Sequence, residues 1–141
     1  MSIKIFYDEI EFRLNKSDRV KKFIDKVIRE EKMIPGDLNF VFTNNKNLRE
    51  INVKFLKRDH NTDVITFNYN FKNKINGEIY ISIETVKSNA LKYIVNLEEE
   101  VIRVMIHGVL HLCGFDDRTK GEKKLIRKIE DARLNDYLKY Y

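Results

Sequence analysis

The chain has few of the residues that cross-link a fold or interrupt its helices and strands. Its 141 residues include one cysteine, one proline, five glycines and no tryptophan. The single cysteine, Cys113, has no internal disulfide partner, which argues against a disulfide-stapled secreted protein and indicates a reducing compartment. No linker, repeat or low-complexity segment divides the sequence. We therefore expect one domain spanning residues 1–141.

Long apolar runs and targeting segments are also missing. The most apolar stretch, near Val101–Cys113, is interrupted by Arg103 and two histidines and is too short to cross a bilayer. The first residues, Met1–Tyr7, alternate like a strand and lack the basic start and apolar run of a signal peptide. These absences predict a cytoplasmic protein without a membrane partner.

The charge balance is positive and uneven. Charged residues make up 35% of the chain and hydrophobic residues 43%, which is typical of a soluble globular protein. The net charge is +5, and eight basic residues stand against four acidic ones between Arg118 and Tyr141. A basic face of this kind suits a polyanion such as RNA. A solvated lysine-rich helix is the alternative interpretation.

Hydrophobic periodicity predicts an alternation of strands and helices. Alternating or apolar runs predict four strands, at Ile3–Tyr7, Leu38–Thr43, Asp63–Asn68 and Glu78–Ile83. Apolar residues at helical spacing predict five helices: one from an N-cap at Ser17 to the break at Pro35-Gly36, one after Asn44-Asn45, then Thr85–Val95, Leu97–Cys113 and the residues after a capping box at Thr119. This order predicts an α+β domain with a small mixed four-stranded sheet packed against about five helices.

The segment His107–Asp117 (HGVLHLCGFDD) carries the most specific pattern. Side chains at i and i+4 project from one helix face, so His107 and His111 can bind the same metal. Gly114 can then end the helix in a left-handed turn and return an aspartate to that metal. This is the spacing of metzincin zinc sites, and it predicts a Zn²⁺ centre of His107, His111 and Asp117.

Several alternatives accompany this prediction. A hydrogen-bonded core histidine is the usual role of a histidine on an apolar helix, and either Asp116 or Asp117 can be the third ligand. Cys113 lies off the ligand face and is interpreted as a small buried hydrophobe rather than a fourth ligand. Gly108 stands where zinc peptidases carry their general base, so Asp116 is the candidate proton acceptor, with a turn cap as its other interpretation.

The same segment resembles the YbeY endoribonucleases, bacterial enzymes implicated in ribosomal RNA maturation and ribosome quality control. Upstream segments agree with this resemblance: Asn52–Asp59 (NVKFLKRD), Thr62–Phe67 (TDVITF) and Gly77–Ser82 (GEIYIS). The resemblance implies a small sheet packed on helices, one zinc ion, cleavage of single-stranded RNA, and ribosomal RNA or a ribosomal subunit as partner.

Two positions depart from the family's pattern. Asp117 stands where the family usually has a third histidine, and a carboxylate is a competent zinc ligand. Leu56 aligns with the family's arginine, which is thought to face the substrate. Lys57 and Arg58 are therefore the candidate substrate-binding residues, and solvated side chains at a helix end are the alternative interpretation of both.

These observations favour a zinc-dependent, single-strand-specific endoribonuclease. The alternative from another class is a non-catalytic ribosome-assembly factor with a structural zinc, which the loss of the arginine at Leu56 favours. A zinc peptidase ranks last because Gly108 has no side chain to act as a base. The sequence leaves the oligomeric state open.

Overall fold

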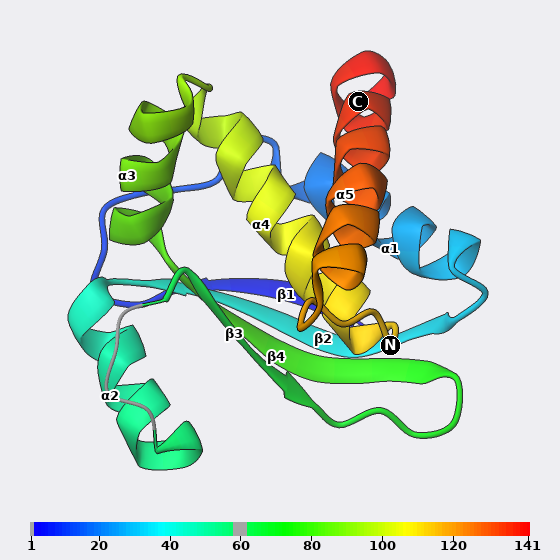
Figure 1. Cartoon of the computed structure of the whole chain (residues 1–141), viewed down its shortest axis with the longest axis horizontal. Coiled ribbons are helices and arrows are strands. Elements are labelled where there is room, and N and C mark those ends of the chain that lie inside the picture. Colours follow the sequence, from blue (N-terminus) through cyan, green and yellow to red (C-terminus); the bar gives the residue numbers. More distant parts are fainter. Residues whose placement is uncertain (1, 58–61) are drawn as a thin grey trace.

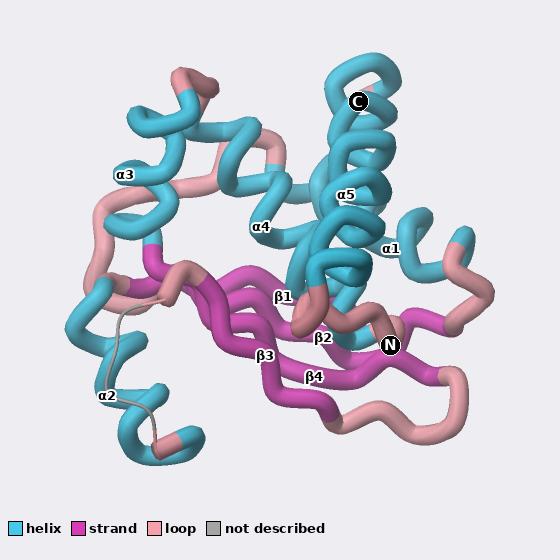
Figure 2. Tube along the Cα trace, viewed as in Figure 1, coloured by secondary structure: helices cyan, strands magenta, loops and turns pink. Residues whose placement is uncertain are grey.

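A computed structural model of the protein describes residues 2–57 and 62–141. Its single sheet has four strands, β1 (Ser2–Tyr7), β2 (Ile34–Thr43), β3 (Val64–Asn68) and β4 (Lys74–Ser82). The strand order is β1-β2-β4-β3. β1, β2 and β4 run parallel, and β3 pairs antiparallel with β4 at one edge (Figures 1 and 2). The predicted mixed four-stranded sheet is confirmed.

The helices found in the described residues are α1 (Ser17–Glu30), α2 (Asn45–Leu56), α3 (Ile83–Tyr93), α4 (Leu97–Leu112) and α5 (Lys120–Tyr140). Figure 1 shows α1, α3, α4 and α5 together on one side of the sheet, with α2 on the other side near one end of the strands. This arrangement confirms the predicted α+β class. Among the described residues, no helix combines the length and apolar content needed to cross a bilayer.

α4 is the central helix of the core, as its nearly continuous apolar sequence predicts. It packs on β4 and β3 below and against α3, α5 and α1 around it. Met105 and Ile106 are fully buried, and the strands contribute Phe40 and Ile79 to the same core. The side chain of Asn96 caps the first turn by accepting a hydrogen bond from the Glu98 N–H.

Two helix starts agree with the sequence. The Asn44 side chain accepts a hydrogen bond from the Asn47 N–H and caps α2. Thr119 and Glu122 form the complete capping box of α5, with each side chain accepting from the other residue's backbone N–H. Both starts are set by contacts within four residues, which explains why the local sequence predicts them.

Two predicted boundaries were wrong. α1 is preceded by Lys16 in a left-handed conformation, and Ser17 is already helical without a side-chain cap. Pro35 and Gly36 lie inside β2 rather than in a break, because a register shift between Pro35 and Leu38 accommodates the proline. The chain turns earlier, at Lys32, where φ is +65°.

Candidate metal centre

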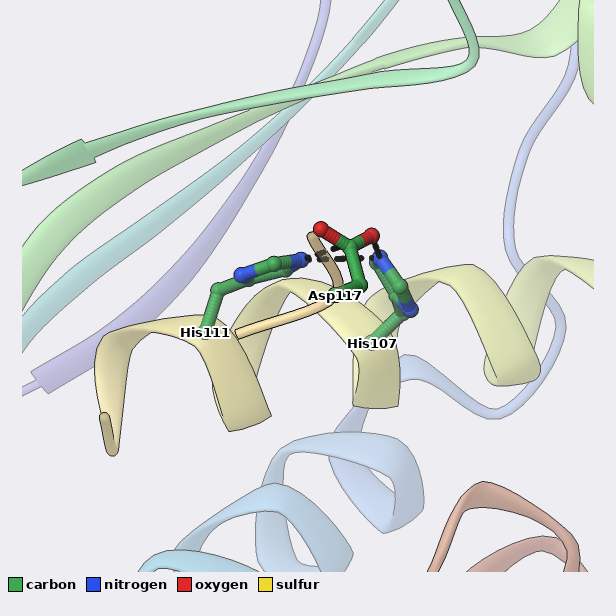
Figure 3. Close-up of side chains that lie close together, drawn as sticks. All are labelled: His107, His111 and Asp117. Atoms are coloured by element: carbon green, nitrogen blue, oxygen red, sulfur yellow. Dashed lines mark hydrogen bonds and ion pairs between the residues drawn. The ribbon is translucent and has the colours of Figure 1, made fainter. Parts of the chain in front are cut away.

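The last two turns of α4 aim two imidazole rings at one point. Four residues separate His107 from His111, so the rings lie one turn apart on the same face. Their Nε2 atoms are 3.0 Å apart (Figure 3). Both side chains keep about a fifth of their surface exposed, 23% for His107 and 22% for His111. The nitrogens are therefore close together and reachable from solvent.

A glycine turn brings the third donor to these nitrogens. Gly114 has φ of +106°, its N–H bonds to the His111 carbonyl, and the Phe115 N–H bonds to the Leu110 carbonyl. These two hydrogen bonds form a Schellman motif, which only glycine enters without strain. The chain reverses, and Asp117 Oδ2 comes to 3.5 Å from both histidine Nε2 atoms. The predicted turn at Gly114 is confirmed.

The donor set fits zinc in chemistry and spacing. Ligand atoms of His107, His111 and Asp117 all lie within 4.8 Å of one another, so this group can hold a metal ion. Tetrahedral zinc with bonds of about 2.0–2.1 Å places neighbouring ligand atoms about 3.3 Å apart. The observed separations, 3.0 Å and 3.5 Å, bracket this value. Within residues 2–57 and 62–141 the group has three members, which is the ligand count of catalytic zinc sites.

Glu130 on α5 holds the other nitrogen of His107. Its carboxylate bonds to His107 Nδ1 and leaves Nε2 facing the metal group. Burial opposes protonation of His107, but the hydrogen bond and negative charge of Glu130 outweigh it and raise the pKa of this imidazole. Arg103 lies 3.5 Å from the same carboxylate. A carboxylate behind a metal-binding histidine fixes the orientation of the ring and strengthens the ligand.

Glu130 was not predicted as a site residue, although the sequence contains a pattern that points to it. Ile126, Glu130 and Leu134 recur every four residues along α5, and all three are buried. A charged residue on an otherwise apolar stripe needs a partner when it is buried. That partner is His107, on a different helix and 23 residues earlier in the chain.

Replacing Glu130 by glutamine is expected to weaken zinc binding by about 10- to 100-fold, because the ring loses its negatively charged anchor. A competition titration with a chromogenic chelator measures this affinity directly. Asp131→Asn is the matched control, since Asp131 also pairs with Arg103, at 2.7 Å, but makes no contact with the histidine. Equal losses in the two variants would contradict an orienting role for Glu130.

Two pockets meet at the metal group. The first, here called the β3 pocket, has a volume of about 310 Å³ and is lined by Asn52, Leu56, Thr62, Asp63, Val64, Ile65, Thr66, His107, His111 and Asp117. The second, the α5 pocket, has a volume of about 290 Å³ and is lined by Asp63, Asn89, Tyr93, Glu100, Arg103, Val104, His107, Asp117, Lys123, Ile126, Arg127 and Glu130. They share Asp63, His107 and Asp117, so both open onto the same donors.

Two of the other predicted site residues, Asp116 and Lys57, lie outside both pockets. Asp116 is exposed and lines neither pocket, so its catalytic role stays a prediction. Lys57 is exposed at the end of α2 and also lines neither pocket. Arg58 lies outside the described residues. Besides the donor Asp117, the carboxyl group of Asp63 lines both pockets, and burial raises its pKa although the positive charge of His107 opposes the shift.

Gly108 and Cys113 have structural explanations. A Cβ atom at Gly108 would lie 2.8 Å from Ile79 Cγ2, so this position faces β4 rather than the metal. A glutamate base has no space there. Cys113 is outside the metal group, and burial, together with the charge of Glu31, raises the pKa of its thiol to about 11. The thiol therefore stays protonated at neutral pH, in agreement with its interpretation as a small hydrophobe.

Comparison with known proteins identifies relatives over nearly the whole chain. The sequence model of the family described as Endoribonuclease YbeY matches residues 4–138. Proteins named Endoribonuclease YbeY include one from Amoebophilus asiaticus, 43% identical over 134 residues, which covers 94% of this chain and 91% of the relative. One from Flavobacterium psychrophilum is 42% identical over 129 residues and covers 92% of each chain.

The fold has a solved counterpart as well. The solution structure of the Thermotoga maritima protein TM1509 matches with a TM-score of 0.69 and 26% sequence identity. The match covers 96% of this chain and 89% of that one. The fold and the sequence thus agree on the same relationship, and the chain belongs to the YbeY endoribonuclease family.

Proposed function

We propose that this protein is a zinc-dependent endoribonuclease that cleaves single-stranded RNA, with ribosomal RNA as its substrate in the cytoplasm. The observation that carries the proposal is the group of His107, His111 and Asp117, which presents three donors to a partly exposed point. Its relatives are named endoribonucleases. The partner is then ribosomal RNA, free or in a ribosomal subunit, and the role is its maturation and quality control.

The chain's own residues supply orientation and proton transfer. The chemistry that zinc supplies in such sites is Lewis-acid polarisation and a lowered pKa for water. Glu130 holds His107 by Nδ1, so that Nε2 is directed at the metal group. Two carboxylates are candidates for accepting the proton of the attacking water: Asp116, which the sequence predicted, and Asp63. Position favours Asp63, because it lines both pockets beside the donors.

A second candidate function is a non-catalytic assembly factor with a structural zinc. The observation in its favour is Leu56, which lines the β3 pocket and cannot contact a phosphate. The two functions differ in coordination, since a structural zinc has four protein ligands and a catalytic zinc keeps one open position. X-ray absorption spectroscopy of the zinc-loaded protein, with and without an added anion, distinguishes a closed shell from an open one.

Removing the metal tests the proposed activity directly. Chelator-treated protein is expected to leave single-stranded RNA intact, and one equivalent of zinc is expected to restore cleavage, because the three donors alone supply no Lewis acid. Gel analysis of end-labelled RNA measures both states. A duplex RNA of the same sequence is the control and should resist cleavage. Cleavage that continues at the same rate without metal would refute the proposal.

A further inference from the structure

We propose that the α5 pocket binds the nucleotide next to the cleaved bond, with Lys123 and Arg127 contacting its phosphate and Tyr93 stacking on its base. This inference rests on the proposed function and adds to it a substrate subsite. The sequence predicted substrate contacts at Lys57 and Arg58, of which Arg58 lies outside the described residues. Lys57 lines neither pocket, whereas Lys123 and Arg127 line the α5 pocket.

The first argument is the unequal distribution of positive charge. Every cationic side chain that lines either pocket, within the described residues, lies in the α5 pocket: Arg103, Lys123 and Arg127. The β3 pocket instead offers amide and hydroxyl groups, from Asn52, Thr62 and Thr66, beside apolar residues. Because Lys and Arg are the main phosphate contacts of RNA-binding proteins, the phosphate belongs in the α5 pocket.

The second argument is that two of these cations are available. Arg103 is occupied, with Glu130 at 3.5 Å and Asp131 at 2.7 Å. Lys123 and Arg127 are exposed, and in the described part of the chain neither forms an ion pair or a side-chain hydrogen bond. They stand four residues apart on α5, so they project from one face toward the same pocket. A phosphate can therefore bind them without breaking an existing contact.

Three of the four acidic residues that line the pocket have partners or belong to the metal group, and the fourth is Asp63. Glu130 bonds to His107, and Glu100 lies 4.0 Å from Arg103. Asp117 belongs to the metal group. Glu100 and Glu130 thus share Arg103 as a cationic neighbour, while Lys123 and Arg127 remain exposed on α5.

Tyr93 supplies the stacking surface. It ends α3, its side chain is 49% exposed, and it lines the same pocket as the two cations. The Lys92 ammonium lies 5.5 Å from the centre of its ring, which adds positive charge beside a stacked base. Asn89, one turn earlier on α3, lines the pocket with a side-chain amide that can both donate to and accept from a base edge. An aromatic ring beside a cationic pocket is the usual arrangement for single-stranded RNA.

The two pockets together define a path for the strand. Since they share Asp63, His107 and Asp117, a strand that occupies both must cross the metal group between them. One nucleotide then lies against Tyr93 and α5, and the next lies against β3. The bond between them is placed at the donors.

A charge-matched pair of double variants tests the phosphate contacts. Lys123→Ala with Arg127→Ala is expected to weaken binding of a short single-stranded RNA by about tenfold or more, and to lower the slope of log affinity against log salt by about 0.7, since each phosphate neutralised on a single strand contributes about 0.7. Lys124→Ala with Lys128→Ala removes the same charge from the same exposed helix, at positions that line neither pocket. It should change affinity less than twofold. Fluorescence anisotropy of metal-free protein measures binding while cleavage is prevented.

A fluorescent base tests the stacking. With an RNA that carries 2-aminopurine, binding to the unaltered protein is expected to quench the base, and Tyr93→Ala should abolish part of this quench and weaken binding by about tenfold. Tyr93→Phe should retain both the quench and the affinity, because stacking needs the ring and not the hydroxyl. Leu91→Ala, a change at a more exposed position of the same helix, is the control.

Each possible outcome is decisive. Equal losses of affinity in the two double variants, or an undiminished quench in Tyr93→Ala, would overturn the subsite and leave the proposed nuclease standing. Binding that follows these expectations, in a protein that never cleaves RNA when loaded with zinc, would instead overturn the nuclease and keep the RNA pocket. No binding of RNA by the unaltered protein would refute both.

Discussion

Alanine in place of His107 or His111 is expected to abolish stoichiometric zinc binding and to lower RNA cleavage by about 10³-fold or more. Each substitution removes one of three donors, and the remaining pair cannot complete the group. A metal ion stabilises the transition state by several kcal/mol, and each 1.4 kcal/mol corresponds to tenfold in rate. Elemental analysis by mass spectrometry and the end-labelled RNA assay measure the two losses in the same samples.

The neighbouring aspartates provide a matched pair for the same experiment. Asp117→Asn should lose zinc and activity together, because the amide is a poor replacement for the carboxylate that lies 3.5 Å from both imidazoles. Asp116→Asn should retain zinc, since Asp116 is exposed and outside the donor group. If Asp116→Asn keeps zinc but loses cleavage, Asp116 is the proton acceptor. The same result in Asp63→Asn assigns that role to Asp63. Cleavage that persists in His107→Ala would contradict a catalytic metal at this site.

Gly108→Ala is expected to destabilise the fold by about 1–3 kcal/mol, the usual range for overpacking a core. The added methyl group would lie 2.8 Å from Cγ2 and 3.1 Å from Cδ1 of Ile79, and that side chain is fully buried and branched at Cβ. Relief requires α4 to move away from β4, and His107 moves with it. Zinc affinity should therefore fall as well. Urea denaturation of the metal-free protein measures the free energy of unfolding.

Gly121→Ala is the control for helix propensity. Gly121 lies in the first turn of α5, where a Cβ atom would meet only Thr119 Oγ1, at 4.0 Å. Alanine there should be neutral or stabilise by up to about 1 kcal/mol, because glycine is the weaker helix former. If Gly108→Ala is as harmless as Gly121→Ala, the close contact between α4 and the sheet is not what positions the metal centre.

The donors of the metal group were predictable because their geometry is local. A helix fixes His107 against His111, and the glycine turn fixes Asp117, all within eleven residues. The capping box at Thr119 was predictable for the same reason. Sequence did not predict that Asp63 would lie at the site, because β3 reaches it only by pairing with β4. Contacts of that kind depend on the order of the strands, which no short pattern encodes.

The positions of the cations in the α5 pocket were unpredictable for the same reason. The position of Lys57 in the motif predicted a substrate contact, but in the structure Lys57 lines neither pocket. Lys123 and Arg127 belong to a run of basic residues that the sequence describes only as a charged helix. Which of these side chains face α4 depends on the rotation of α5 about its own axis. That rotation is set by the packing of Ile126 and Leu134, which are both buried. The sequence thus predicts that α5 is basic, whereas its packing decides which basic residues face the site.

The bond between Glu130 and His107 also sets an order of events during synthesis. α4 and the glycine turn leave the ribosome before α5, so a growing chain contains all three zinc donors before it contains the carboxylate that orients the first of them. Until α5 docks, the His107 ring lacks this hydrogen bond. On the proposed function, tight binding of zinc, and with it cleavage of RNA, thus waits until the helix that carries Lys123 and Arg127 is in place.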